Sequence, residues 1–156
     1  MDENLSGTRK PAIVRQAREE DLEAILALVR ELAEYEKSPQ MVTATPDTYR
    51  DAFNSGYFEA LVAELDGEIV GTAIYYRTFS TWKGRMMYLE DFIVTEAYRR
   101  SGTGRLLFEV FLEKAREAQS VLCKWQVLRW NDPAIRFYQK YETVFDDAWV
   151  DVKLYF

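Results

Sequence analysis

The chain has 156 residues, of which 48% are hydrophobic and 15% aromatic, and its formal net charge is −6. This length fits one domain with one sizeable core, and the acidic balance argues against nucleic acid as a partner. The sequence has no histidine and one cysteine, which excludes His-based triads, nearly all the usual zinc sites and an intrachain disulfide. We therefore expect no metal and a cytoplasmic location. We also expect no membrane span, because no run approaches the roughly eighteen apolar residues that a span needs.

The first half of the chain alternates helical and strand patterns. Residues 1–10 are polar and are expected to form a flexible tail, and residues 11–156 to form a single domain. The spacing of apolar residues predicts a helix that begins near Glu19 and ends before Ser38-Pro39. Thr45-Pro46 indicates the start of a second helix. Strands are predicted over 12–16, 58–65, 68–79 and 86–94, with a tight turn at Asp66-Gly67.

The second half continues with a helix from Arg105 to Gln119, a strand over 121–128 and a helix capped by Asn131-Asp132-Pro133. Alternation after Val144 predicts two final strands as a hairpin. This order indicates an α+β (mixed α/β) fold with a mixed sheet. Cys123 lies in an apolar run, which favours a buried structural thiol.

The stretch from Tyr88 to Leu107 combines a strand, a glycine-bearing loop and a helix N-terminus. Such a junction can bind an anion, because its backbone N–H groups and the helix dipole both favour negative charge. A Walker loop is excluded by the missing Lys-Ser/Thr, and a dinucleotide fingerprint by the missing third glycine. The spacing that remains is Arg99-x-x-Gly102-x-Gly104. A plain glycine turn before a surface helix is the alternative interpretation.

This spacing resembles the pyrophosphate loop of GNAT acetyltransferases, Arg/Gln-x-x-Gly-x-Gly/Ala. Further segments resemble the diamine (spermidine/spermine) acetyltransferase subgroup and its thialysine-acetylating branch; they cover residues 30–37, 80–85, 88–91 and 130–138. The resemblance implies a GNAT-type acyl-CoA N-acyltransferase fold, with a central mixed, mostly antiparallel sheet and helices on both faces. It also implies acetyl-CoA as donor, a primary amine as acceptor, direct transfer through a ternary complex, and a homodimer.

The resemblance also implies where the donor binds. The central strand and the fifth strand would splay apart, and the pantetheine arm would lie between them. Backbone groups of the central strand and of the glycine loop would hold the donor, with arginine charges near its phosphates and Asn131 near the pantetheine. The implied residues are Phe92, Ile93, Val94, Arg99, Arg100, Ser101, Gly102, Thr103, Gly104, Arg105 and Asn131.

Acid–base chemistry must use carboxylates, tyrosines or lysines here, because histidine is absent. Glu90 and Asp91 are adjacent on a strand, so their side chains point to opposite faces unless the strand bulges. By the resemblance, Glu90 is the general base through water, and Tyr138 is the general acid that protonates the leaving thiolate. The alternatives are a solvated Glu-Asp pair and a half-buried aromatic beside Phe137.

The resemblance implies an acceptor site of acidic and aromatic residues, which suit a cation. Its members are Tyr35, Glu36, Trp82, Glu90, Asp91 and Trp149. Ser80 stands where polyamine-preferring members carry an acid, and Arg129 stands where an acid is common. Both departures favour a shorter amine or an amino-acid side chain. A peptide or protein amine acetyltransferase and a non-catalytic acyl-CoA-binding sensor are the alternative functions.

Overall fold

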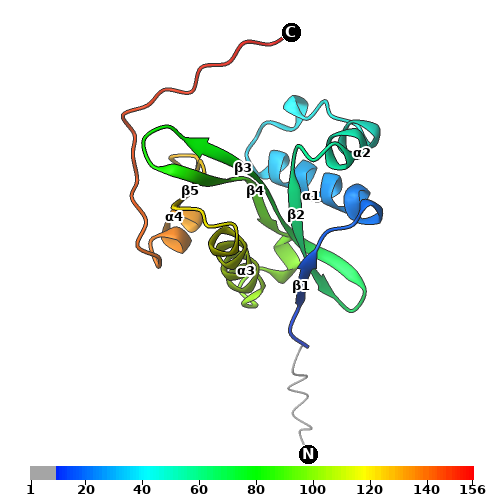
Figure 1. Ribbon diagram of the computed structural model, residues 1–156. Helices are drawn as coiled ribbons and strands as arrows, with labels where there is room; N and C mark the ends of the chain where they lie inside the picture. The colour runs from blue at the N-terminus through cyan, green and yellow to red at the C-terminus, as the bar shows by residue number, and fades with distance from the viewer. Residues whose placement is uncertain (1–9) are drawn as a thin grey trace, which may run out of the picture. The chain divides into compact units, whose positions relative to one another are not determined.

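The computed structural model describes residues 10–156 (Figure 1). Of the tail predicted over residues 1–10, all but Lys10 lies outside the described residues. The chain divides into two compact units, one up to Trp125 and one from Gln126 to Phe156, and each is described by itself. The prediction of a single domain over residues 11–156 stays a prediction.

The first unit is built on a five-stranded sheet in the order β1-β2-β3-β4-β5. Neighbouring strands are antiparallel except β4 and β5, which are parallel. The strands are β1 (Ile13–Gln16), β2 (Glu59–Leu65), β3 (Glu68–Ser80), β4 (Gly84–Val94) and β5 (Leu122–Lys124). The predicted mixed, mostly antiparallel sheet is thus confirmed.

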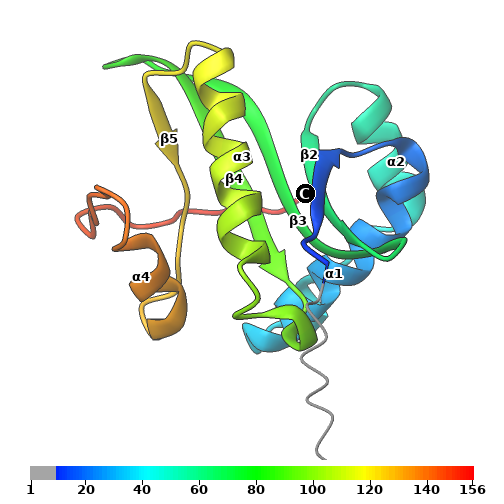
Figure 2. The ribbon, with the colours of Figure 1, turned by 90° about the horizontal axis from the view of Figure 1, so that it is seen from below.

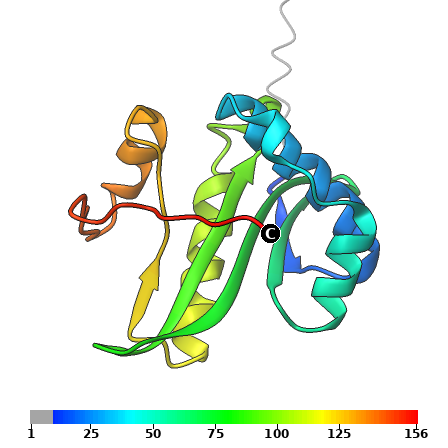
Figure 3. The same cartoon turned by 90° about the horizontal axis from the view of Figure 1, so that it is seen from above.

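Helices cover both faces of this sheet (Figures 2 and 3). Leu22 and Ile25 of the first α-helix pack with Ile74 on one face, whereas the Tyr75 ring meets Phe111 on the other face at a centroid distance of 5.6 Å. Because successive strand residues point to opposite faces, β3 carries both packings. The α-helices of the first unit are α1 (Leu22–Tyr35), α2 (Pro46–Asn54) and α3 (Thr103–Glu117), with 3-10 turns at Glu19–Asp21, Pro39–Met41 and Glu96–Tyr98.

Local signals explain the element ends in this unit. Thr45 Oγ1 accepts a hydrogen bond from Thr48 N at 3.2 Å, which caps α2 directly before Pro46. Gly71 lies where β3 approaches β4 closely, because a Cβ there would stand 3.0 Å from the Ile93 carbonyl oxygen. Among the described residues, none of the helices is long and apolar enough to cross a membrane.

The second unit contains α4 (Asp132–Tyr138) and differs from the sequence prediction in its last part. The predicted hairpin of two final strands is wrong, since residues 144–156 form no strand. The predicted strand over 121–128 forms only as β5, Leu122–Lys124. Alternation shows that a segment can be a strand, but a strand also needs a neighbouring edge to bond to.

Candidate active site

Glu90 occupies a β-bulge in β4. Asp91 pairs with Ile74 and Leu89 pairs with Tyr75, so Glu90 is an extra residue that has no paired residue on β3. The bulge breaks the alternation of side chains and brings Glu90 and Asp91 to the α1 and α2 face of the sheet. Glu90 reaches Tyr76 there, with the Tyr76 hydroxyl donating to Glu90 Oε2 at 3.0 Å. The bulge that the resemblance implied is therefore present.

The two carboxylates lie in an acidic cluster on this face. Burial, reinforced by the charges of Glu90 and Glu36, raises the pKa of Asp91 to about 6. Burial also raises the pKa of Glu36. Tyr49 of α2 faces the same group, and burial together with the Asp91 charge raises its pKa to about 12. These shifts mark a negative, partly desolvated surface, which favours a cation.

Of the predicted acceptor residues, Glu36, Glu90 and Asp91 form this cluster, whereas Trp82 lies apart from it. Tyr35 ends α1 and Glu36 is its C-cap, so the end of this helix brings Glu36 to the cluster. Trp82 lies in the turn between β3 and β4 and is 79% exposed. From Gly84 to Glu90 the strand rises by about 20 Å at ~3.3 Å per residue. The first unit therefore does not bring Trp82 together with Glu90.

The predicted pyrophosphate loop connects β4 to α3. Gly102 precedes the helix with a φ of 85°, the left-handed region that favours glycine. The first N–H groups of α3, which begins at Thr103, point out of the start of the helix, an arrangement that favours an anion. A Cβ on Gly102 would meet nothing within 4 Å, and one on Gly104 would come no closer than 3.7 Å to Val94 Cγ2. The loop is thus open for a phosphate to approach the backbone.

Side chains of the loop mainly fix its shape. The Ser101 hydroxyl donates to the Tyr98 carbonyl oxygen and lies 2.8 Å from the hydroxyl of Thr103, which is buried. Arg105 forms an exposed ion pair with Glu109 at 2.8 Å. Arg100 is exposed and has a positive φ of 63°.

Arg99 ties the loop to α1. Its Nε donates to the Val94 carbonyl oxygen at 2.9 Å, and its guanidinium lies 5.1 Å from the ring centroid of Tyr35. Glu31 of α1 accepts hydrogen bonds from Thr95 Oγ1 at 2.8 Å and from Glu96 N at 3.1 Å. The predicted donor loop and the predicted acceptor residue Tyr35 are therefore in direct contact.

The edge of β4 next to this loop is only partly paired with β5. β4 pairs with β5 only from Met86 to Tyr88, so within residues 10–156 the stretch from Leu89 to Val94 has no strand partner on that side. This stretch contains Phe92, Ile93 and Val94, the predicted backbone partners of the donor. Phe92 is anchored by Phe108 of α3 at a ring distance of 5.7 Å.

The other predicted site residues belong to the second unit. Asn131 caps α4, with its Oδ1 accepting from Ala134 N at 3.3 Å. Tyr138 ends α4, is 6% exposed and meets the Phe137 ring at 5.4 Å. Trp149 is exposed and its indole N–H donates to Asp146 Oδ2 at 3.2 Å.

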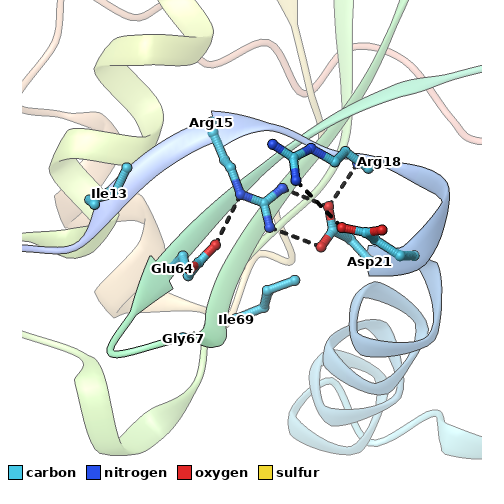
Figure 4. A pocket seen from close by; sticks show the side chains of 8 residues that line it. Ile13, Arg15, Arg18, Asp21, Glu64, Gly67 and Ile69 are labelled. Atoms are coloured by element: carbon cyan, nitrogen blue, oxygen red, sulfur yellow. Dashed lines mark hydrogen bonds and ion pairs between the residues drawn. The ribbon is translucent and has the colours of Figure 1, made fainter.

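A hollow of about 530 Å³ lies beside β1 and β2 and contains none of these residues (Figure 4). Its charged side chains satisfy each other. Arg15 donates to Asp21 at 2.7 Å and to Glu64 at 2.9 Å, and the Arg15 bond holds the pKa of Asp21 below its usual range. We interpret this cluster as a clamp that joins β1, β2 and the start of α1.

Sequence reasoning missed three residues at the site, namely Glu31, Tyr49 and Tyr76. Each acts through a contact with a distant part of the chain, which one sequence does not reveal. For Tyr76 the only available signal is its aromatic type within a predicted strand.

Comparison with known proteins supports the acetyltransferase fold and activity that the sequence predicts. Residues 13–142 match the acetyltransferase (GNAT) family. Thialysine N-epsilon-acetyltransferase of Bos taurus is 38% identical over 137 residues, which span 81% of each chain. The Homo sapiens spermidine/spermine N(1)-acetyltransferase-like protein 1 is 34% identical over 134 residues, covering 80% of this chain and 19% of that protein.

A solved structure of an aminoglycoside acetyltransferase, HMB0005, from an uncultured soil metagenomic sample has a TM-score of 0.78. It shares 23% identity, and the match covers 94% of this chain and 100% of that one. At this identity the likeness concerns the fold alone. The family match extends over most of the chain and includes both the bulged strand and the glycine loop. The chain therefore belongs to the GNAT family of acetyltransferases.

Proposed function

We propose that this acetyltransferase moves an acetyl group from acetyl-CoA to a primary amine of a small cationic acceptor, by direct transfer within a ternary complex. The observation that carries the proposal is the bulge in β4, because it directs Glu90 and Asp91 to one face. With Glu36 nearby, three carboxyl groups gather where α1 ends. Such a surface attracts an ammonium group and disfavours an anionic acceptor.

An amine acceptor must lose a proton before it can react. The pKa of a primary amine free in water is about 10.4, so fewer than ~1 in 1,000 amines are neutral at pH 7, which adds about 4–5 kcal/mol to the barrier. A carboxylate can hold the cation and accept this proton, directly or through water. We assign this role to Glu90 and the holding of the cation to Asp91 and Glu36.

The bonds exchanged then follow. The neutral amine nitrogen attacks the thioester carbonyl carbon, the new C–N bond forms, and the C–S bond breaks. The leaving thiolate takes a proton, for which we propose the hydroxyl of Tyr138, and the tyrosinate takes back the second proton that the nitrogen loses as the amide forms. The donor supplies only the activated acetyl group in this scheme.

The glycine loop and the open edge of β4 suit acetyl-CoA as the donor. The first N–H groups of α3 and the charges of Arg100 and Arg105 would hold the pyrophosphate. Backbone groups from Phe92 to Val94 would bond the pantetheine, with Asn131 as a further contact. Within residues 10–156, β4 has no strand partner on that side beyond Tyr88, which supports this arrangement.

As the acceptor we propose a lysine-like amino acid such as thialysine, in preference to a polyamine. Relatives from Bos taurus, Sus scrofa and Mus musculus named thialysine N-epsilon-acetyltransferases are 37–38% identical to this chain. Ser80 and Arg129, where acids would suit a long polycation, support the same preference. Trp82 and Trp149 stay candidates for contacts with the far end of an acceptor.

The direct test measures CoA release by the purified protein with thialysine, lysine, putrescine, spermidine, spermine and a lysine peptide. We expect the highest kcat/KM with thialysine or lysine. Preference for spermine would contradict the assigned acceptor, and preference for the peptide would favour a protein amine acetyltransferase. Tight acetyl-CoA binding without turnover on any acceptor would favour a non-catalytic sensor.

Two substitutions test the assigned roles. We expect Glu90→Gln to lower kcat by about 100-fold and to flatten the acidic limb of its pH profile, the usual size for a lost general base. Tyr138→Phe should lower kcat by a similar factor without changing the KM for acetyl-CoA. An unchanged profile in either variant would remove that residue from its role.

We further propose a cytoplasmic homodimer. The C-terminal segment supports the dimer, because its exposed apolar side chains are typical of a surface that another chain covers. The lone cysteine fits a reducing compartment.

A further inference from the structure

Tyr76 lies across the sheet from the bulge, on the same face as the acidic cluster. It pairs with Tyr88 in the β3–β4 ladder, and the two rings stack at 5.3 Å with an interplanar angle of 20°. This stack leaves the ring little freedom to rotate. The hydroxyl is thereby held toward the bulge, where it lies 3.0 Å from Glu90 Oε2.

The direction of this hydrogen bond matters for the proton transfer. The phenol donates and the carboxylate accepts, so the bond fixes one carboxylate oxygen, Oε2, on the side of Tyr76. Burial and the negative Glu90 together raise the pKa of Tyr76 well above its ordinary value, which keeps the phenol a donor at every working pH. In the described part of the chain, the second oxygen, Oε1, accepts no hydrogen bond and is available to water or to an amine.

We propose that Tyr76 is a positioning residue for the proton acceptor: its hydroxyl fixes the Glu90 carboxylate at the bulge and directs Oε1 toward the acceptor. The inference rests on the proposed function, in which Glu90 takes the proton of the amine. It adds a residue that the sequence pattern did not indicate.

If Tyr76 had a purely structural role, removing its hydroxyl would lower the stability of the protein as well as its turnover. The hydroxyl contacts an exposed carboxylate, and such surface bonds contribute little to folding. The ring supplies the packing, through its stack on Tyr88. Removing only the hydroxyl should therefore affect the reaction much more than the stability.

The test is Tyr76→Phe, which keeps the ring and removes the donor. We expect kcat to fall roughly tenfold, the order expected for one hydrogen bond to a charged group. The KM for acetyl-CoA and the melting temperature should stay unchanged. Tyr57→Phe, at an exposed tyrosine after α2, is the matched control and should behave as wild type.

The double variant shows whether Tyr76 acts on kcat through Glu90. If Tyr76 acts through Glu90, adding Tyr76→Phe to Glu90→Gln should lower kcat no further. A tenfold further loss would overturn the inference, and so would a wild-type kcat in the single variant. Neither outcome would contradict the proposed acetyl transfer.

A measurement without turnover separates the inference from the proposed function. The ring carbon that bears the Tyr76 hydroxyl can be followed by NMR as the phenol ionises. Glu90→Gln removes the negative partner, so the pKa of Tyr76 should fall relative to wild type. An unchanged titration would overturn the inference even in an active enzyme. A fall in a protein that acetylates no amine would support the contact and contradict the proposed function.

Discussion

At the residue scale, the bulge places Asp91 where its charge is unfavourable. A pKa of about 6 in the folded chain, against 3.8 for an aspartate in water, means that folding disfavours the ionised form. Its contribution to stability is therefore fully present below about pH 4 and is lost as the pH rises through 6. A bound ammonium group would relieve this unfavourable charge, so the same residue connects stability with acceptor affinity.

We predict that Asp91→Asn raises the stability of the free protein at pH 7.5, by at most about 3 kcal/mol for a shift of two pKa units. The gain should shrink as the pH falls to 5, because wild-type Asp91 then takes up a proton. The KM for the amine should rise in the same variant. Denaturant unfolding at both pH values measures the first effect, and initial rates measure the second.

Asp51→Asn, at an exposed position of α2, is the control and should change neither quantity. If Asp91→Asn lowered the stability of the protein equally at pH 5 and 7.5, Asp91 would serve the fold as a hydrogen-bonding group. The assignment of its burial as an unfavourable feature would then be wrong.

At the element scale, the junction of β4 and α3 depends on two glycines in different ways. Gly102 has a positive φ of 85°, so an L side chain there is strained, although a Cβ would have open space. Gly104 lies inside α3 with only ordinary contacts around its Cβ position. The pattern of the family, in which the second glycine can be alanine, has this physical basis.

We predict that Gly102→Ala costs about 1–2 kcal/mol of stability and weakens acetyl-CoA binding, because the left-handed backbone must change. Gly104→Ala should be neutral or should stabilise the free protein by up to about 1 kcal/mol, since alanine favours the helix. Urea unfolding and calorimetric titration with CoA check both. Equal effects of the two substitutions would show that the loop conformation does not depend on Gly102.

Local signals predicted most of these elements. Proline, capping residues and apolar spacing located α1 to α4, and the Asp66-Gly67 turn located the β2–β3 hairpin. The bulge could not be predicted from alternation, which puts Glu90 and Asp91 on opposite faces. An extra residue in a strand is defined only by the register of its neighbour, and here that neighbour is β3.

The site, too, could be predicted from the sequence only where its residues are close together in the chain. The glycine loop is continuous in sequence and was visible in it, as was the end of α1 with Tyr35 and Glu36. The contacts of Arg99 with Tyr35 and of Tyr76 with Glu90 cross between elements. Such pairs depend on how α1, β3 and β4 meet in space, so no local pattern in the sequence indicates them.

At the scale of the whole molecule, the C-terminal segment is the part that lacks a structural explanation within one chain. Val150, Val152, Leu154 and Phe156 alternate along it and are 75% or more exposed. An extended segment with this pattern presents one apolar face. Its exposure is unfavourable in water and is typical of a strand that another chain completes.

We therefore predict that a second copy of the chain covers this segment in the proposed homodimer. Two charges on the apolar face, Val152→Lys with Leu154→Lys, should convert the dimer into a monomer, because an unpaired charge in such an interface is costly. Lys153→Gln, between these positions on the opposite face of the alternation, should leave the dimer intact. Sedimentation equilibrium of the three proteins gives their masses directly. A monomeric wild type would contradict the homodimer itself. A dimer that persists with both lysines would place the interface outside the C-terminal segment and leave its exposed side chains for another partner.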